Sequence, residues 1–214
     1  MSLVFDAGQG KAARGFLALG DSYTIGEGVA VAERWPSQFA ALCRDKGVDL
    51  GEPVVIAQTG WTTDELDAAI DTAELGQTLR PPYALVSLLI GVNNQYRGRD
   101  LGTYEVDYAG LLARAIRFAG DRPDRVLALS IPDWGVTAFA AADARGPTAI
   151  GTQIDAYNQV AQRLCASHGV VFINITDISR QYPDWLVADQ LHPDARQYLA
   201  WAKSAAEGYL LPSH

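Results

Sequence analysis

The chain has 214 residues, of which 49% are hydrophobic and 20% charged, and its formal net charge is −8. This composition is that of a folded globular protein, and it excludes collagen-like, disordered and disulfide-scaffold chains. Because acidic residues outnumber basic ones and the basic residues form no stripe, we expect neither nucleic acid nor an anionic membrane surface as a partner. The length fits one domain, which we expect to span residues 1–214. The two cysteines, Cys43 and Cys165, lack metal-ligand spacing and are predicted to be small buried side chains.

No segment has the length of a membrane span or the pattern of a secretion signal. The longest apolar run, Ala84–Ile90, has the length of a strand and falls far short of the roughly 20 residues of a membrane-spanning helix. The first residues, Met-Ser-Leu-Val-Phe-Asp, lack the basic and apolar regions of a signal peptide. We therefore expect a cytoplasmic protein, unless a native signal peptide has been removed and Met1–Leu3 remain from expression.

Short apolar runs alternate along the chain with longer segments of helical periodicity. The apolar runs are continuous, which is typical of parallel strands buried on both faces. In chain order we predict a strand over Phe16–Leu19, a helix over Trp35–Lys46, a strand over Val54–Ala57, a helix over Thr63–Leu75, a strand over Ala84–Ile90, a helix over Tyr104–Ala119, a strand over Val126–Ile131, a loop with a short helix over Trp134–Pro147, a helix from Ile150 to Leu164, a strand over Val170–Ile173, and a last helix after His192 with Pro193 near its first turn.

This alternation predicts an α/β fold. Five strands separated by helices indicate βαβ units on a parallel sheet. Right-handed crossovers then give a three-layer α/β/α sandwich with a five-stranded parallel sheet. In such a sheet, ligands bind beyond the carboxyl ends of the strands. The residues that follow each strand are therefore the first candidates for a functional site.

Chemically competent residues do follow the predicted strands. The segments are Gly20-Asp21-Ser22-Tyr23, Gln58-Thr59-Gly60-Trp61, Gly91-Val92-Asn93-Asn94, Pro132-Asp133-Trp134 and, on the way to the last helix, Asp189-Gln190-Leu191-His192-Pro193. A hydroxyl, a glycine, a carboxamide and an Asp/His pair are thus predicted to meet at one edge of the sheet.

These groups suffice for acyl transfer. A serine hydroxyl becomes a nucleophile when a neighbouring base takes its proton, and histidine is the side chain best suited to do so at neutral pH. A carboxylate on the other imidazole nitrogen fixes the tautomer, and N–H donors stabilise the oxyanion. Of the three histidines, His214 is terminal, and His168 stands before Gly169 at a predicted helix end, where we expect it to cap carbonyl groups or to interact favourably with the helix dipole. His192 remains, and it alone has an aspartate, Asp189, three residues before it.

The chain resembles the GDSL/SGNH hydrolases in four blocks, whose order and spacing match over nearly its whole length. The blocks are Gly20-Asp21-Ser22, Gly60, Gly91-Val92-Asn93-Asn94 and Asp189-Gln190-Leu191-His192-Pro193. The resemblance implies a flavodoxin-like sandwich. It also implies a serine esterase that needs neither metal nor cofactor and cleaves carboxylic esters through an acyl-enzyme.

The resemblance further implies a role for each matching residue. Ser22 would be the nucleophile, His192 the general base and Asp189 the residue that orients the histidine. The backbone N–H groups of Ser22 and Gly60 and the side chain of Asn93 would hold the oxyanion. One position departs from the family: the third block often reads Gly-x-Asn-Asp, and here Asn94 stands in the last place. The departure puts the hydrogen bonding of this loop in question, and not the triad.

Several features near the strand ends allow other interpretations. Trp61 and Trp134 either belong to the core or wall a substrate pocket, and the sequence favours neither. Asp21 is expected to order the turn at Ser22 and not to act in catalysis. Among esters, the compact chain favours small, soluble, short-acyl substrates, and no residue separates aryl esters, thioesters, lysophospholipids and acetylated carbohydrates.

Three other functions stay open at this point. Gly26-Glu27-Gly28 after the first strand is compatible with a nucleotide- or flavin-binding module, although Glu27 would repel a phosphate and is otherwise a solvated loop residue. Asp21 with a divalent cation would support phosphoryl transfer, which needs further carboxylates nearby. The third is a binding protein that has the fold without activity.

Overall fold

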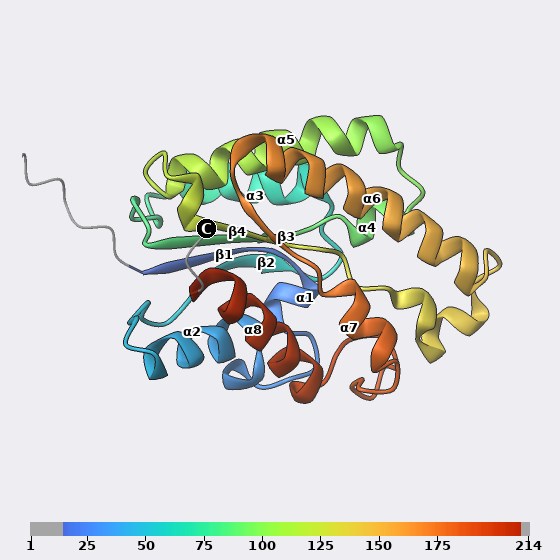
Figure 1. Cartoon of the computed structure of the whole chain (residues 1–214). Coiled ribbons are helices and arrows are strands. Elements are labelled where there is room, and N and C mark those ends of the chain that lie inside the picture. The colour runs from blue at the N-terminus through green and yellow to red at the C-terminus, as the bar shows by residue number, and fades with distance from the viewer. Residues whose placement is uncertain (1–14, 211–214) are drawn as a thin grey trace, which may run out of the picture.

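The structure, a computed structural model, describes residues 15–210 (Figure 1). Met1–Leu3 and His214, discussed above, lie outside the described residues. Five strands form one sheet in which all neighbouring strands are parallel, in the order β2-β1-β3-β4-β5. The strands are β1 (Phe16–Asp21), β2 (Val54–Gln58), β3 (Leu85–Leu89), β4 (Val126–Leu129) and β5 (Val171–Ile173).

Helices cover both faces of this sheet. The helices are α1 (Ser22–Ile25), α2 (Trp35–Asp45), α3 (Thr63–Leu75), α4 (Val92–Tyr96), α5 (Leu101–Phe118), α6 (Pro147–His168), α7 (Thr176–Gln181) and α8 (Ala195–Leu210), with 3-10 turns η1 (Val31–Glu33), η2 (Pro123–Arg125), η3 (Trp134–Val136) and η4 (Ala138–Ala142). α2 and α8 pack together on one face, and α3, α5 and α6 lie on the other (Figure 1). The predicted three-layer α/β/α sandwich is therefore confirmed.

The central strands are buried along their whole length because helices cover them on both sides. Every residue of β1, β3 and β4 is buried. In the middle of the sheet, Leu19 pairs with Ile56 on one side and with Leu88 on the other. Burial of one such side chain stabilises the fold by about 1.5–3 kcal/mol. This two-sided burial is the reason that the strands read as unbroken apolar runs.

The predicted strands are all present, but some are shorter than their apolar runs. The run Val126–Ile131 contains β4 only as far as Leu129. The Ser130 N–H still donates to the carbonyl oxygen of Ile173 on β5 at 3.0 Å, but the next N–H, that of Ile131, donates to the side-chain Oδ1 of Asn158 at 2.7 Å. The apolar residues past the strand end are still buried, which is why the sequence pattern continues through them.

Most helices match the prediction, and the short ones do not appear in it. α3 has the predicted bounds, with a capping box in which the Thr62 N–H donates to Glu65 at 2.9 Å. α5 begins earlier than predicted, where the Asp100 carboxylate accepts the Thr103 N–H at 2.9 Å. Helices α1, α4 and α7 have four to six residues, too few to show a periodicity.

The last helix follows His192, as predicted. Pro193, expected near its first turn, lies outside the helix and pairs with Leu186 in an isolated antiparallel bridge. α8 starts at Ala195, and the carboxylate of Asp194 accepts the Arg196 N–H at 2.9 Å. Pro193 thus lies just before the first turn and not within it, because Asp194 caps the helix and satisfies a free N–H of that turn.

The strand order places one crevice at the centre of the sheet. From β1 the chain winds outward to β2 and then returns to the other side of β1 to form β3. The loops after β1 and β3 therefore leave the sheet in opposite directions, and the gap between them is where flavodoxin-like folds bind ligands. The segments that start with Ser22, Gly60 and Asn93 all emerge at this edge.

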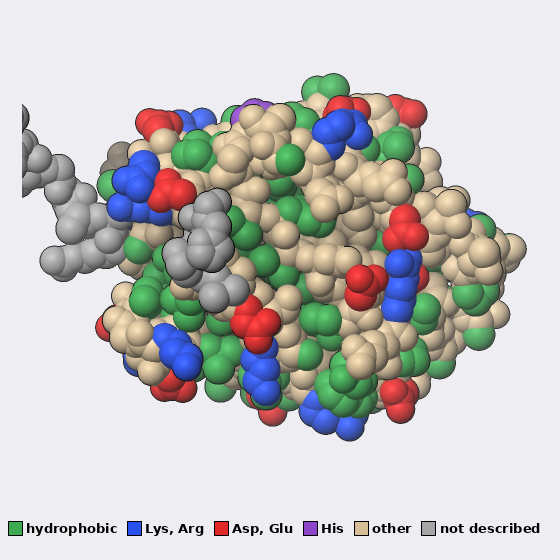
Figure 2. Space-filling model, in the orientation of Figure 1, with side chains coloured by type: hydrophobic (Ala, Val, Ile, Leu, Met, Phe, Trp, Pro, Cys, Tyr) green, Lys and Arg blue, Asp and Glu red, His purple; other side chains and the backbone are tan. Residues whose placement is uncertain are grey.

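The outer surface carries mixed charge. On the face that Figure 2 shows, acidic and basic side chains are interspersed among uncharged side chains and backbone. Between residues 15 and 210, no helix combines the length and the apolar character needed to cross a lipid bilayer.

Candidate active site

Ser22 is the first residue of a four-residue helix that follows β1 directly. Asp21 caps this helix by accepting the Tyr23 N–H at 3.0 Å. The helix ends at Gly26, whose φ of 70° is one that glycine adopts readily and whose N–H donates to Ser22 O at 3.0 Å. Ser22 is 4% exposed, and the N–H of a first helical residue has no partner within its helix. The turn thus presents both the hydroxyl and the N–H of Ser22 at the edge of the sheet.

Asp21 is fully buried beneath this turn. Its Oδ1 accepts the Tyr23 N–H, whereas its Oδ2 has no hydrogen-bond partner in the described part of the chain. Burial raises the pKa of Asp21 to about 7, although the hydrogen bond from Tyr23 opposes the rise. Asp21 therefore stabilises the turn that contains Ser22 through its hydrogen bond with the Tyr23 N–H.

Asp189 and His192 form a tightly bonded pair within one loop. His192 Nδ1 lies 2.6 Å from Asp189 Oδ2, and Asp189 Oδ1 accepts the backbone N–H groups of Leu191 and His192 at 2.8 and 2.9 Å. Burial would raise the pKa of Asp189, but these hydrogen bonds together hold it below its ordinary value. An ionised carboxylate only accepts, so Nδ1 carries the proton and Nε2 is left as the basic nitrogen.

Neighbouring groups hold the histidine loop in place. The Val187 N–H donates to His192 O at 2.9 Å. On the other side, the ring of Tyr23 lies 5.5 Å from the imidazole and 5.9 Å from the indole of Trp201 on α8. The orientation of His192 is thereby set by packing as well as by its bond to Asp189.

One cavity of about 170 Å³ brings four of the predicted residues together, because Ser22, Gly60, Asn93 and His192 all line it. Asp189 reaches the site through its bond to His192. Within residues 15–210, no hydrogen bond joins the side chains of Ser22 and His192; catalytic hydrogen bonds often tighten only when substrate is bound.

The other two candidate oxyanion donors are Gly60 and Asn93, and a hydrogen bond joins the two segments that contain them. Gly60 has a φ of 88°, a conformation that favours glycine. The Asn93 Nδ2 donates to the carbonyl oxygen of Trp61, the residue after Gly60, at 2.9 Å. A carboxamide nitrogen carries two hydrogens, so this bond orients the amide and leaves the second N–H for a ligand.

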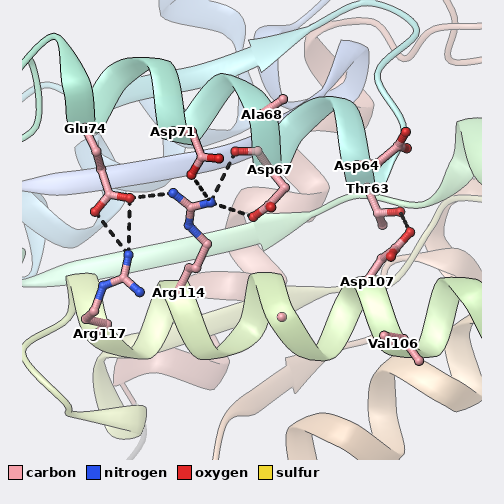
Figure 3. Close-up of a pocket in the computed structure, with 11 residues that line it drawn as sticks. Thr63, Asp64, Asp67, Ala68, Asp71, Glu74, Val106, Asp107, Arg114 and Arg117 are labelled. Atoms are coloured by element: carbon pink, nitrogen blue, oxygen red, sulfur yellow. Dashed lines mark hydrogen bonds and ion pairs between the residues drawn. The ribbon is translucent and has the colours of Figure 1, made fainter.

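Asn94, the position that departs from the family, holds the start of α3. Its Oδ1 accepts the Thr63 N–H at 3.1 Å, and its Nδ2 donates to Thr63 Oγ1 at 2.7 Å. The Thr63 hydroxyl donates its one proton to Asp107 Oδ2 at 2.9 Å, and Figure 3 shows these two side chains facing each other between α3 and α5. Since that proton is committed, the hydroxyl needs a donor on its other side. An amide supplies the donor, whereas an ionised aspartate would not.

A larger cavity of about 620 Å³ lies between α3 and α5 and is separate from the candidate site (Figure 3). Arg114 reaches from α5 to α3, where its NH1 lies 2.7 Å from Asp67 Oδ1 and 2.6 Å from Asp71 Oδ1, and it also contacts Glu74. These carboxylates are thus engaged in bridging two helices of the outer layer.

Comparison with known proteins identifies the family. The sequence profile of the GDSL-like Lipase/Acylhydrolase family matches residues 18–200. The chain belongs to this family. Similar solved structures include the lipase Lip_vut3 from a goat rumen metagenome (17% identity, TM-score 0.71, 92% of this chain and 97% of that one). A lipase/acylhydrolase from Enterococcus faecalis matches at 20% identity, with a TM-score of 0.65 over 91% of this chain and 94% of that one.

A third similar structure is a mutant of Axe2, an acetyl-xylooligosaccharide esterase from Geobacillus Stearmophilus (16% identity, TM-score 0.67, 93% of this chain and 95% of that one). At these identities the likeness shows the fold. No curated protein matches the sequence.

The two tryptophans at this GDSL-family site differ in position. Trp134 is 2% exposed and lines the cavity, with its Nε1 donating to Gln95 Oε1 at 2.8 Å. Trp61 is half-buried against the core and is not among the residues that line the cavity. Its contribution is the backbone carbonyl that orients Asn93.

Several residues of this candidate site were assigned no role from the sequence. Tyr23, Tyr96 and Phe139 line the cavity, and Arg97 bonds the carbonyl oxygen of Gly60. Tyr23 directly follows Ser22, and Tyr96 lies three residues after Asn93. This closeness to the motifs is the one sequence signal that could have found them. Phe139 lies in an alanine-rich segment whose path only the fold determines.

The features that supported other functions have structural roles. A Cβ on Gly28 would lie 2.7 Å from Val187 Cγ2, so this glycine packs against the histidine loop. Glu27 is exposed but not merely solvated, because its carboxylate accepts a hydrogen bond from Thr59. Between residues 15 and 210, no three His, Cys, Asp or Glu side chains are grouped so as to hold a metal ion.

The remaining histidine and the cysteines match their predicted structural roles. His168 Nδ1 lies 2.8 Å from Leu164 O at the end of α6, which confirms the predicted cap. Cys43 and Cys165 are buried, and burial raises the pKa of each thiol to about 11.

Proposed function

We propose that this GDSL-family chain is a serine esterase for small, soluble, short-acyl carboxylic esters. Ser22 is its nucleophile, His192 its general base and Asp189 the residue that orients the base. One observation carries the proposal: the Asp189–His192 pair, with 2.6 Å between Oδ2 and Nδ1, adjoins the cavity that Ser22 also lines. An ionised carboxylate on the far nitrogen of a histidine is what a general base requires.

In the first step, Ser22 Oγ attacks the carbonyl carbon of the ester while His192 Nε2 takes the hydroxyl proton. The carbonyl oxygen becomes an oxyanion, held by the N–H groups of Ser22 and Gly60 and by the second N–H of the Asn93 amide. Asp189 stabilises the imidazolium. The bond from carbon to the alcohol oxygen then breaks, and the alcohol leaves with the proton from His192.

In the second step, water clears the acyl group from the serine. His192 Nε2 takes a proton from a water molecule, whose oxygen attacks the acyl carbon, and the same donors hold the second oxyanion. The carbon–Oγ bond breaks, Ser22 Oγ takes the proton back from His192, and the carboxylic acid is released.

The cavity supports small substrates. Its volume of about 170 Å³ lies below the 300–1,000 Å³ that is usual for drug-sized ligands. Apart from the catalytic groups, its walls include Val92, Leu191 and Trp134. A short acyl or alcohol group fits such a space, whereas a long acyl chain would extend out of it.

The proposal is tested by assaying the protein and a Ser22→Ala variant on p-nitrophenyl acetate, butyrate and octanoate, with and without EDTA. We expect hydrolysis that EDTA does not affect, that falls from butyrate to octanoate, and that the variant lacks. A fluorophosphonate should label Ser22, as peptide mass spectrometry would show. Equal rates from both proteins would remove Ser22 as the nucleophile, and inhibition by EDTA would point to a metal-dependent reaction.

A further inference from the structure

Three aromatic rings meet at the candidate cavity, and we call this set, Tyr96, Trp134 and Phe139, the aromatic cleft. The Trp134 ring lies 5.3 Å from Tyr96 and 6.1 Å from Phe139, with interplanar angles of 68° and 65°. All three line the same cavity as Ser22 and His192. They come from α4, η3 and η4, so the cleft is a product of the fold and not of one sequence motif.

Two of these rings are exposed although they are large and mostly apolar. Tyr96 is 47% exposed and Phe139 is 41% exposed, while Trp134 between them is 2% exposed. A group of exposed apolar side chains that adjoins a cavity is typical of a ligand-binding surface.

The cleft is held in place by the protein itself. The indole Nε1 of Trp134 donates to Gln95 Oε1 at 2.8 Å, and Gln95 Nε2 donates to Gln153 Oε1 at 2.7 Å. The Phe139 N–H donates to the carbonyl oxygen of Gln190 at 3.2 Å. Since the one polar atom of the indole is already bonded, Trp134 offers its ring carbons to a ligand.

The charges beside the cleft are already paired. The guanidinium of Arg145 lies 5.3 Å from the Trp134 ring centre and 5.7 Å from that of Tyr96. It forms two bonds to Asp143, from Nε at 2.9 Å and from NH2 at 2.8 Å. An anionic substrate group would have to compete with Asp143 for this cation, which favours a neutral one.

Two polar side chains in the cavity wall, those of Thr59 and Asn93, already have hydrogen-bond partners within the protein. Thr59 Oγ1 donates to Glu27, and Asn93 Nδ2 donates to Trp61 O. A group rich in hydroxyls, such as a sugar, therefore gains few hydrogen bonds from these residues. An aromatic ring needs none and gains edge-to-face contacts with the rings of the cleft.

We propose that the aromatic cleft binds one neutral aromatic ring of the ester, in either its acyl or its alcohol group. The proposal rests on the ester hydrolysis proposed above. The size agrees with it, because a cavity of about 150 Å³ in an apolar protein interior holds one benzene, and this cavity measures about 170 Å³. The substrate class is thus neutral aryl or arylalkyl esters.

The test compares aromatic esters with saturated ones of the same connectivity. Benzyl acetate against cyclohexylmethyl acetate examines the alcohol side, and methyl phenylacetate against methyl cyclohexylacetate examines the acyl side. In each pair the ring is separated from the ester by a methylene group, so the leaving groups are similar. We expect kcat/KM to favour the aromatic ester by about 3- to 10-fold in one of the two pairs, the usual scale of an aromatic contact.

Variants connect this preference to the cleft. Phe139→Ala and Tyr96→Ala should reduce the preference to nearly one, and Tyr96→Phe should keep it, because the ring and not the hydroxyl makes the contact. Leu75→Ala is the control, since Leu75 is an exposed apolar side chain at the end of α3. Circular dichroism and thermal unfolding establish that each variant is folded.

Each outcome decides between the two proposals. A ratio near one in both pairs, a ratio that the cleft variants leave unchanged, or faster hydrolysis of acetylated xylo-oligosaccharide would overturn the aromatic cleft while ester hydrolysis stands. If no ester is hydrolysed, the proposed function fails by itself. Calorimetric titration of N-benzylacetamide and N-(cyclohexylmethyl)acetamide into Ser22→Ala then still tests the cleft: tighter binding of the benzyl compound supports it, and equal binding rejects it.

Discussion

The guanidinium group of Arg97 donates a hydrogen bond of 2.6 Å to the carbonyl oxygen of Gly60. The other arm of Arg97 pairs with Glu65 near the start of α3, at 3.3 Å. Arg97 directly follows α4, and Asn93 on that helix bonds the carbonyl oxygen of Trp61, the next residue of the same loop. Two hydrogen bonds from one short segment therefore hold the loop that carries the Gly60 N–H.

This arrangement predicts that Arg97→Ala lowers kcat on p-nitrophenyl acetate by about 3- to 10-fold and changes KM little. The full loss of one oxyanion donor lowers kcat by about 10²–10³-fold. A donor that is present but less well positioned should lower kcat by a smaller factor. KM should stay nearly unchanged, because the oxyanion forms only on the way to the transition state and is absent from the bound substrate. Steady-state kinetics give both constants, and Arg97→Lys, which can still reach the carbonyl, should recover part of the rate.

Arg99→Ala is the matched control for that experiment. Arg99 also lies after α4 and also pairs with an acidic residue at the start of α3, Asp64, but within residues 15–210 it donates no hydrogen bond to Gly60. Exposed ion pairs of this kind contribute about 0–1 kcal/mol, so both variants should unfold at nearly the temperature of the parent protein. Equal losses of kcat in the two variants would show that Arg97 acts only through general stability.

Asn93→Ala should lower kcat by roughly 10²–10³-fold, because it removes the proposed side-chain donor to the oxyanion. The same substitution also removes the bond to Trp61 O, so the Gly60 loop is affected as well. Combining Asn93→Ala with Arg97→Ala tests this connection. If both residues position one loop, the double variant loses less than the product of the two single losses. An Asn93→Ala variant with the kcat of the parent protein would remove Asn93 from the oxyanion hole.

Asp189→Asn should lower kcat by roughly 10³–10⁴-fold while leaving the loop folded. An asparagine still accepts the N–H groups of Leu191 and His192 through its Oδ1. At the other position it presents an N–H to His192 Nδ1, which favours the wrong tautomer of the base. Kinetics and thermal unfolding are measured together. A loss smaller than tenfold would mean that this carboxylate does not orient a general base.

The raised pKa of Asp21 predicts that the free energy of unfolding depends on pH. Its pKa is about 7 in the folded chain, raised by burial from an ordinary 3.8. Between these two values the folded protein holds a proton that the unfolded chain has lost. Stability therefore falls as the pH rises through about 4 to 7, and the full penalty, on the order of 4 kcal/mol, is present above that range.

Asp21→Asn tests this directly, because asparagine keeps an acceptor for the Tyr23 N–H and carries no charge. The free energy of unfolding, measured with urea at pH 5 and pH 8, should fall more between these values in the parent protein than in the variant. Other groups titrate in both proteins alike, so the difference between the two falls reports Asp21. Parallel pH dependences would show that the buried carboxyl has an ordinary pKa in the folded state.

The sequence by itself determined the fold class and the residues placed at one edge of the sheet. Parallel strands buried on both faces require continuous apolar runs, so the strands are visible without coordinates. The Asp189–His192 pair is visible for a different reason: its members are three residues apart, and a loop of that length can join them without help from the rest of the chain. The serine turn likewise follows its strand directly.

Only the tertiary structure decided which side chains wall the cavity and which hold the loop that contains Gly60. Trp61 and Trp134 both follow a strand, yet packing places one against the core and the other in the cavity. Arg97 reaches Gly60 across 37 positions of the sequence, and no local pattern marks such a pair. Contacts of this kind depend on how the helical layers pack over the sheet, and packing is a property of the whole chain, whereas periodicity and short-range hydrogen bonding are properties of a segment.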